Sequence, residues 1–137
     1  MTLCDSGFLI CLAEPKEPKS DDCKRLVSDI KGPLTTTWPC IAESMYSLGR
    51  RGGGWRKQKF VAELILNGFL IIYETEKPDY SRLFSLMEQY QDVPMDLADA
   101  SLVYTAERTG DPQILTFDSD FFFYRINNRD SFDVLEV

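Results

Sequence analysis

The sequence predicts an α/β fold of three layers, in which a parallel sheet of four to five strands lies between two layers of helices. Short apolar or β-branched runs recur along the chain, segments with helical periodicity lie between them, and glycine or proline often marks the boundaries. Strands that alternate with helices form parallel sheets, because a parallel connection needs a long crossover. We expect residues 1–137 to form one such domain.

The N-terminal half is expected to contain two strands and four helices. The second helix begins at Ser20, where the acidic residues that follow suit the positive end of a helix dipole, and it stops at Gly32-Pro33. Pro39 suits the first turn of the next helix, which is expected to end near Gly49, and the glycines at 52–54 are expected to form a flexible joint. In order, the expected elements are a strand at 2–4, helices at 8–13 and 20–31, a strand at 34–38, and helices at 39–49 and 55–67.

The C-terminal half is expected to contain three strands and two helices. Its first strand is a continuous apolar run, which is typical of a strand covered on both faces. Leu83, Leu86 and Met87 then recur at the helical period. In order, the expected elements are a strand at 69–73, helices at 79–90 and 97–109, a strand at 114–117 and an edge strand at 132–135.

The composition excludes several kinds of chemistry. The chain carries a net charge of −7 and has no histidine. Without histidine it cannot build a Ser-His-Asp or Cys-His catalytic site or a histidine zinc site by itself. Hydrolytic chemistry must therefore use carboxylates, thiols, lysines or a bound metal. No stretch has the pattern of a secretory signal or a membrane span, so we expect a cytoplasmic protein with no membrane partner.

Six acidic residues stand near the ends of predicted strands or at the start of a predicted helix. Because the carboxyl ends of parallel strands meet at one edge of the sheet, we expect these side chains to share a cleft. They are Asp5 after the first strand, Glu43 one turn beyond the second, Asp96 and Asp99 in the first turn of the helix at 97–109, and Asp118 and Asp120 after the strand at 114–117.

A divalent cation would stabilise such a cluster. Like charges a few ångströms apart raise one another's pKa, and a cation removes this penalty. Mg²⁺ and Mn²⁺ prefer oxygen ligands, and a pair of such ions about 4 Å apart can activate water and stabilise the leaving oxygen of a phosphodiester. Hydrolysis of nucleic acid without histidine therefore has a physical route.

Each acid also has a purely structural interpretation. Asp96 could simply cap its helix, and Asp118 could cap the turn before Phe121. Glu43 could lie on a solvated helix face, and Asp5 could belong to an ordinary turn. The joint placement of the acids at one edge carries more weight than any one of them.

A basic segment without acidic residues lies between residues 50 and 59. Such a patch on an acidic protein suits a phosphate backbone, so we consider these residues as RNA-binding candidates. A solvated helix face and a grip on an acidic partner remain alternatives, and Trp55 is expected in the core. The candidates are Arg50, Arg51, Arg56, Lys57 and Lys59.

The motifs around these acids resemble those of the PIN-domain ribonucleases, especially the VapC-type toxins of bacterial toxin–antitoxin pairs. The resemblance implies a PIN-like α/β/α fold that binds Mg²⁺ or Mn²⁺ and cleaves single-stranded or structured RNA to leave a 5′-phosphate. The motifs are Leu3-Cys4-Asp5-Ser6-Gly7, Ile41-Ala42-Glu43-Ser44, Asp96-Leu97-Ala98-Asp99-Ala100 and Ile114-Leu115-Thr116-Phe117-Asp118-Ser119-Asp120-Phe121.

The resemblance also implies a role for each acid. Many relatives have threonine where this chain has Ser6, and the serine hydroxyl can still hydrogen-bond a carboxylate or a water molecule. Ser6 and Asp96 are expected to support the ligands. The implied catalytic and metal-binding residues are Asp5, Glu43, Asp99 and Asp118, with Asp120 as an optional further ligand.

The resemblance implies a homodimer and a cognate antitoxin protein that covers the cleft. Three alternatives remain open: a non-catalytic PIN-like module that binds RNA or protein, a housekeeping RNA-processing nuclease, and a phosphoacceptor regulator. Regulators of the last kind use a lysine after a late strand, where this chain has Asp118.

Overall fold

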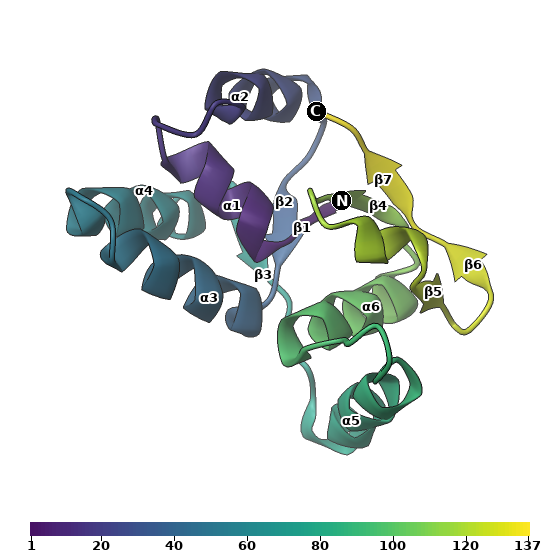
Figure 1. The fold of residues 1–137 in the computed structure, drawn as a ribbon. Helices are drawn as coiled ribbons and strands as arrows, with labels where there is room; N and C mark the ends of the chain where they lie inside the picture. Colours follow the sequence, from purple (N-terminus) through teal and green to yellow (C-terminus); the bar gives the residue numbers. More distant parts are fainter.

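The computed structural model describes residues 1–137 as a three-layer α/β/α arrangement (Figure 1). Five strands form one parallel sheet in the order β3-β2-β1-β4-β7, which confirms the predicted fold class. The strands are β1 (Thr2–Cys4), β2 (Leu34–Thr36), β3 (Leu70–Ile72), β4 (Gln113–Leu115) and β7 (Asp133–Leu135).

Six α-helices cover the sheet. The first four pack on one another on one side of the sheet, and the last two form a pair on the other side (Figure 1). No helix is both long and apolar enough to cross a lipid bilayer. The helices are α1 (Ser6–Ala13), α2 (Ser20–Asp29), α3 (Trp38–Gly49), α4 (Gly54–Leu66), α5 (Tyr80–Gln89) and α6 (Leu97–Thr109).

The central strand β1 supplies both hydrophobic cores. Successive side chains of a strand point to opposite faces, so Leu3 packs with α5 and α6 whereas Cys4 packs with α1 to α4. The neighbouring strand β4 repeats this alternation, because Ile114 is paired with Leu3 and Leu115 with Cys4. Burial on both faces holds β1 and β4 rigidly side by side at the centre of the sheet.

The boundaries differ from the sequence-based expectation mainly at the starts of helices. Helix α1 begins at Ser6 rather than at residue 8, because the carboxylate of Asp5 accepts the backbone N–H of Phe8 at 2.9 Å and caps the helix. Strand β2 ends at Thr36, because α3 already begins at Trp38.

Four short elements are absent from the expectation, and three of them lie near the C-terminus. Two of them form an antiparallel hairpin, and its turn places Asn127 and Asn128 in the left-handed region, which asparagine tolerates better than most residues. These elements are the 3₁₀ helices η1 (Lys77–Asp79) and η2 (Ser119–Phe122) and the strands β5 (Arg125–Ile126) and β6 (Asp130–Ser131).

Candidate active site

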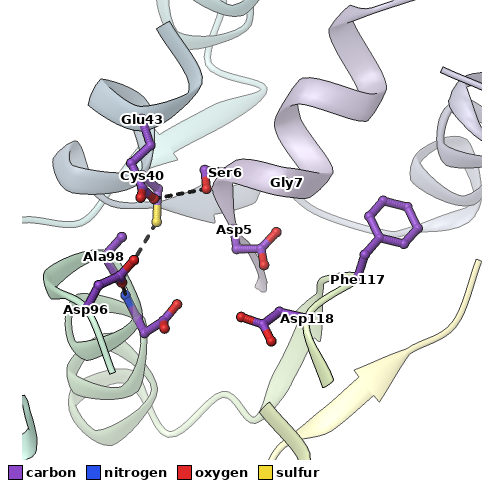
Figure 2. A pocket seen from close by; sticks show the side chains of 10 residues that line it. Asp5, Ser6, Gly7, Cys40, Glu43, Asp96, Ala98, Phe117 and Asp118 are labelled. Carbon is purple, nitrogen blue, oxygen red and sulfur yellow. Dashed lines mark hydrogen bonds between the residues drawn. The ribbon is translucent and has the colours of Figure 1, made fainter. Parts of the chain in front are cut away.

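An acidic pocket of about 360 Å³ opens at the carboxyl ends of β1 and β4, beside the first turns of α1, α3 and α6 (Figure 2). Eight of its ten lining residues are polar, glycine or thiol-bearing, and five of them are carboxylates. The carboxylates are Asp5, Glu43, Asp96, Asp99 and Asp118, and the other lining residues are Ser6, Gly7, Cys40, Ala98 and Phe117.

The pocket brings together six of the seven residues predicted for the metal site. Asp120 is the exception, since it does not line the pocket. Its backbone N–H instead donates to the Asp118 carboxylate at 2.9 Å, so Asp120 belongs to the turn that orients Asp118. The structural interpretation of Asp118 as a cap is thus correct. Asp118 could also bind a metal ion, because its other carboxylate oxygen takes part in no hydrogen bond within the chain.

Asp5 is held by both of its carboxylate oxygens. One oxygen accepts the N–H of Phe8, and the other accepts the hydroxyl of Thr116. The Thr116 oxygen in turn accepts the backbone N–H of Asp118 at 2.9 Å. Thr116 therefore ties the residue after β1 to the residue after β4.

Asp96 and Asp99 share the first turn of α6. Asp96 caps this helix by accepting the N–H of Asp99 at 2.8 Å, as its structural interpretation predicts. The carboxylate of Asp99 accepts the hydroxyl of Tyr124 at 3.0 Å. The Tyr124 ring is fully buried, so Asp99 is held from the core side of the molecule.

Glu43 is oriented across the pocket by α1. The Ser6 hydroxyl donates to the Glu43 carboxylate at 3.0 Å (Figure 2). The serine thus makes the contact expected of a supporting hydroxyl at this position. Beneath them, burial raises the pKa of the Cys40 thiol to about 11, so Cys40 is protonated at neutral pH and is no nucleophile there.

The pocket contains no compensating cation. None of the ion pairs of the chain includes any of its five carboxylates. No lysine lines the pocket either, which disfavours the phosphoacceptor alternative.

Three of the carboxyl groups of the pocket hold their protons more tightly than usual, because their pKa values are raised. Burial raises the pKa of Asp5 to about 6; the hydrogen bonds from Thr116 and Phe8 oppose this rise, and the nearby Asp118 and Glu43 add to it. Burial also raises the pKa of Asp99 to about 7, and the neighbouring Asp96 carboxylate adds to the effect. The pKa of Glu43 is raised for the same two reasons.

The donor set of the pocket fits a hard divalent cation. No three acidic or cysteine side chains lie close enough together to ligate one ion, so the chain does not form a ready-made cage. Mg²⁺ in proteins is commonly bound by one or two carboxylates, while water and phosphate oxygens complete its octahedron. Asp5, Asp99 and Asp118 offer carboxylate oxygens of this kind without a competing cation.

The basic segment lies apart from this pocket, and most of it is already paired. Arg51 contacts Glu17 at 3.1 Å, Lys59 contacts Glu63 at 3.8 Å, and Lys57 is bound to Glu14. Arg50 donates to the Tyr46 hydroxyl, and Arg56 is exposed without an ion-pair partner. Trp55 is 70% exposed, so its expected place in the core is wrong.

Three further residues contribute to the pocket without an assigned role in the sequence pattern. The sequence indicates a role for Thr116 only weakly, since a hydroxyl two residues before Asp118 stands at the end of a predicted strand. It gives no indication for Tyr124, because the aromatic run at 121–124 is typical of a core. Phe117 directly precedes the pocket residue Asp118, but its exposure depends on the path of the loop after β4.

The fold and the site define a class of protein: an α/β/α domain whose carboxylates gather at the carboxyl edge of a parallel sheet. A family model described as PIN domain matches residues 2–128, and the chain belongs to this family. Among solved structures, the fold is similar to that of VapC20 from Mycobacterium tuberculosis, described as a Sarcin-Ricin loop cleaving toxin. The TM-score is 0.79 at 17% sequence identity, over 88% of this chain and 92% of that one. No curated protein matches the chain by sequence.

Proposed function

We propose that this protein is a metal-dependent endoribonuclease that cleaves single-stranded RNA, with the acidic pocket as its active site. The observation that carries the proposal is the group of five carboxylates without a cationic partner at the carboxyl edge of the sheet. Membership of the PIN-domain family and the similarity to a toxin described as cleaving an RNA loop support it.

The residues of the pocket divide the work between binding and orientation. Asp5, Glu43, Asp99 and Asp118 would hold one or two ions, each ion bound by one or two of these carboxylates, with water and phosphate oxygens as its other ligands. When bound, Mg²⁺ or Mn²⁺ would neutralise the carboxylates and the phosphodiester and lower the pKa of the attacking water. The remaining polar groups keep the carboxylates oriented before substrate arrives, as electrostatic preorganisation requires. They are Ser6 on Glu43, Thr116 on Asp5 and Tyr124 on Asp99.

Cleavage of labelled single-stranded RNA in Mg²⁺, in Mn²⁺ and in EDTA tests this proposal. Asp5→Asn and Asp99→Asn keep the size and shape of each side chain but remove its charge. We expect cleavage with either ion, none in EDTA, and a loss of about 10³-fold or more in each variant, comparable to the removal of one strong electrostatic group. Asp92→Asn, an exposed acid outside the pocket, is the matched control and should cleave at the wild-type rate.

Undiminished cleavage in Asp5→Asn or Asp99→Asn would contradict this assignment. RNA binding without metal-dependent cleavage would favour the non-catalytic alternative instead.

We further propose that the chain is the toxin of a toxin–antitoxin pair and forms a homodimer. The structural similarity to VapC20 supports the first part. Induced expression should arrest growth of the host cell, and the arrest should disappear in Asp5→Asn and on co-expression of a small protein encoded next to this chain. Light scattering of the purified protein measures the dimer, and a monomer at micromolar concentration would contradict it.

A further inference from the structure

The aromatic ring of Phe117 lies at the rim of the acidic pocket. Its neighbours in the sequence are Thr116, which holds Asp5, and Asp118, which lines the pocket. The side chain is 44% exposed and lines the pocket together with two adjoining hollows of about 490 and 250 Å³. Figure 2 shows the ring on the side of the pocket away from Asp96, turned away from the carboxylates.

The ring has a firm support beneath it. Phe8 is fully buried in α1, and its ring stacks near that of Phe117 with centroids 6.1 Å apart and an angle of 24° between the planes. Phe117 is therefore held as a flat apolar surface that remains open to solvent. This exposure leaves the aromatic face available to a ligand, and covering it would gain about 25 cal/mol per Å².

A free cation accompanies the ring. The Lys19 ammonium lies 5.5 Å from the centroid of Phe117, and Lys19 lines both adjoining hollows. It forms no ion pair, unlike Arg51 in the larger hollow, which is bound to Glu17. Lys19 is thus the one unpaired cation in the three connected hollows.

We propose that Phe117 and Lys19 form a nucleotide subsite beside the cleavage site, in which an unpaired RNA base stacks on the Phe117 ring and Lys19 binds a phosphate of the same strand. The inference rests on the proposed ribonuclease function. A base displaces the ammonium from the ring, and the ammonium is free to move because no carboxylate holds it. Stacking accepts every base, so the subsite selects for unpaired nucleotides rather than for a sequence.

Single-turnover cleavage separates binding at this subsite from the chemical step. The probe is a fluorescein-labelled single-stranded RNA that the wild type cleaves, chosen from a panel of mixed-sequence oligonucleotides, with enzyme in excess. Phe117→Leu keeps an apolar side chain but removes the aromatic face. We expect its half-saturating enzyme concentration to rise about tenfold, as loss of one stacked base implies, with the maximal rate unchanged within about twofold.

Two comparisons make this result specific. Phe117→Trp should restore the half-saturating concentration, because a larger aromatic face stacks at least as well. Phe84→Leu is the matched control, since Phe84 is an exposed phenylalanine on α5 that lines none of these hollows, and it should behave as the wild type.

Lys19 is tested through the dependence on salt. Lys19→Met should raise the half-saturating concentration and lower the slope of log affinity against log salt concentration by about 0.7, the value for one phosphate contact on a single strand. Lys31→Met, at an exposed lysine without an ion pair, should change neither quantity.

The outcomes distinguish this subsite from the ribonuclease proposal on which it rests. If the wild type cleaves RNA and Phe117→Leu has the same half-saturating concentration, the subsite proposal is wrong and the ribonuclease proposal stands. An exposed ring that binds a protein partner would give this result. A lower maximal rate with unchanged saturation also overturns the subsite, because the ring would then act on pocket geometry. If the wild type neither binds nor cleaves RNA, both proposals fail.

Discussion

Asp5 and Glu14 are buried carboxylates at the two ends of helix α1, and their surroundings are opposite. Glu14 is bound by Lys57 and also lies near Arg51, and these cations hold its pKa below the ordinary value. Asp5 has hydrogen bonds but no cation, and burial raises its pKa to about 6. The fold can therefore compensate a buried acid, and it does so at one end of the helix only.

The presence or absence of a partner cation distinguishes carboxylates that support the fold from carboxylates that are available to bind a ligand. The paired acids at the far end of α1 need nothing from outside the chain. The acidic pocket is destabilised by its own charges until a cation arrives, which is a common feature of binding sites. Substitutions and pH changes in either region should therefore alter stability or activity in different ways.

The largest effect on stability is expected at the compensated end. Lys57→Met removes the main partner of buried Glu14 and leaves its charge inadequately paired, so we expect the melting temperature to fall by roughly 5–10 °C. Lys59→Met breaks an exposed pair with Glu63 and is the control, with a shift of about 1–2 °C or less. Calorimetry measures both, and equal shifts would mean that burial of Glu14 does not matter.

The acidic pocket should make the metal-free protein less stable as pH rises. The folded state keeps protons on Asp5 and Asp99 up to about pH 6 and 7, whereas the unfolded state loses them near 3.8. Stability therefore falls as pH rises through this window and levels off above it. Glu14 has the opposite sign, because its lowered pKa gives stability that is lost as pH falls below its usual value of 4.5.

Urea denaturation in EDTA between pH 4 and pH 8 measures this balance. We expect maximal stability at about pH 4 to 4.5 and a loss on the order of 2 kcal/mol between pH 5 and pH 8, after allowance for solvent screening of the partly exposed Asp99. Stability that is flat or rising from pH 5 to pH 8 would mean that the carboxylates do not repel one another.

Removal of one charge from the pocket should stabilise the metal-free protein. Asp99→Asn eliminates a carboxylate that lies near Asp96 and Asp118 while the amide oxygen can still accept the Tyr124 hydroxyl. We expect a gain of about 1 kcal/mol at pH 8 in EDTA, a smaller gain at pH 5, and none near pH 3, where the carboxyl is protonated in both the folded and the unfolded states. A loss of stability at pH 8 would count against the comparison.

The smallest effect is expected at Ser6. Ser6→Ala removes the hydrogen bond that orients Glu43, so kcat/KM for RNA should fall about three- to tenfold with little change in stability. Ser6→Thr keeps a hydroxyl and should retain most of the activity. If the Ser6→Ala variant cleaves RNA as well as the wild type, the orientation of Glu43 does not depend on this hydrogen bond.

The sequence predicts the sheet and the acidic edge well because both depend on local patterns. Each strand lies in a short segment rich in apolar or β-branched residues. Asp5 directly follows β1 and Asp118 lies three residues beyond the end of β4, and these two strands are neighbours in the sheet. The position of Asp99 follows equally simply, since it lies in the first turn of a helix whose cap is Asp96.

Contacts between distant residues explain what the sequence does not predict. Lys57 and Glu14 are 43 residues apart, so nothing in the basic segment indicates that its charges are already paired. The support of Asp99 by Tyr124 and of Asp5 by Thr116 likewise depends on how β4 and the loop after it pack against the start of α1 and α6. Trp55 is exposed because it begins α4 on its outer side, which its residue type does not reveal.

Whether the acidic pocket binds a divalent cation is measured by titration of the protein with Mn²⁺, followed by calorimetry and by the electron paramagnetic resonance signal of free Mn²⁺. We expect the wild type and Asp92→Asn to bind one or two ions at pH 8 and Asp99→Asn to lose this binding. Wild-type protein that takes up no ion, or an Asp99→Asn variant that binds as tightly as the wild type, would contradict this expectation.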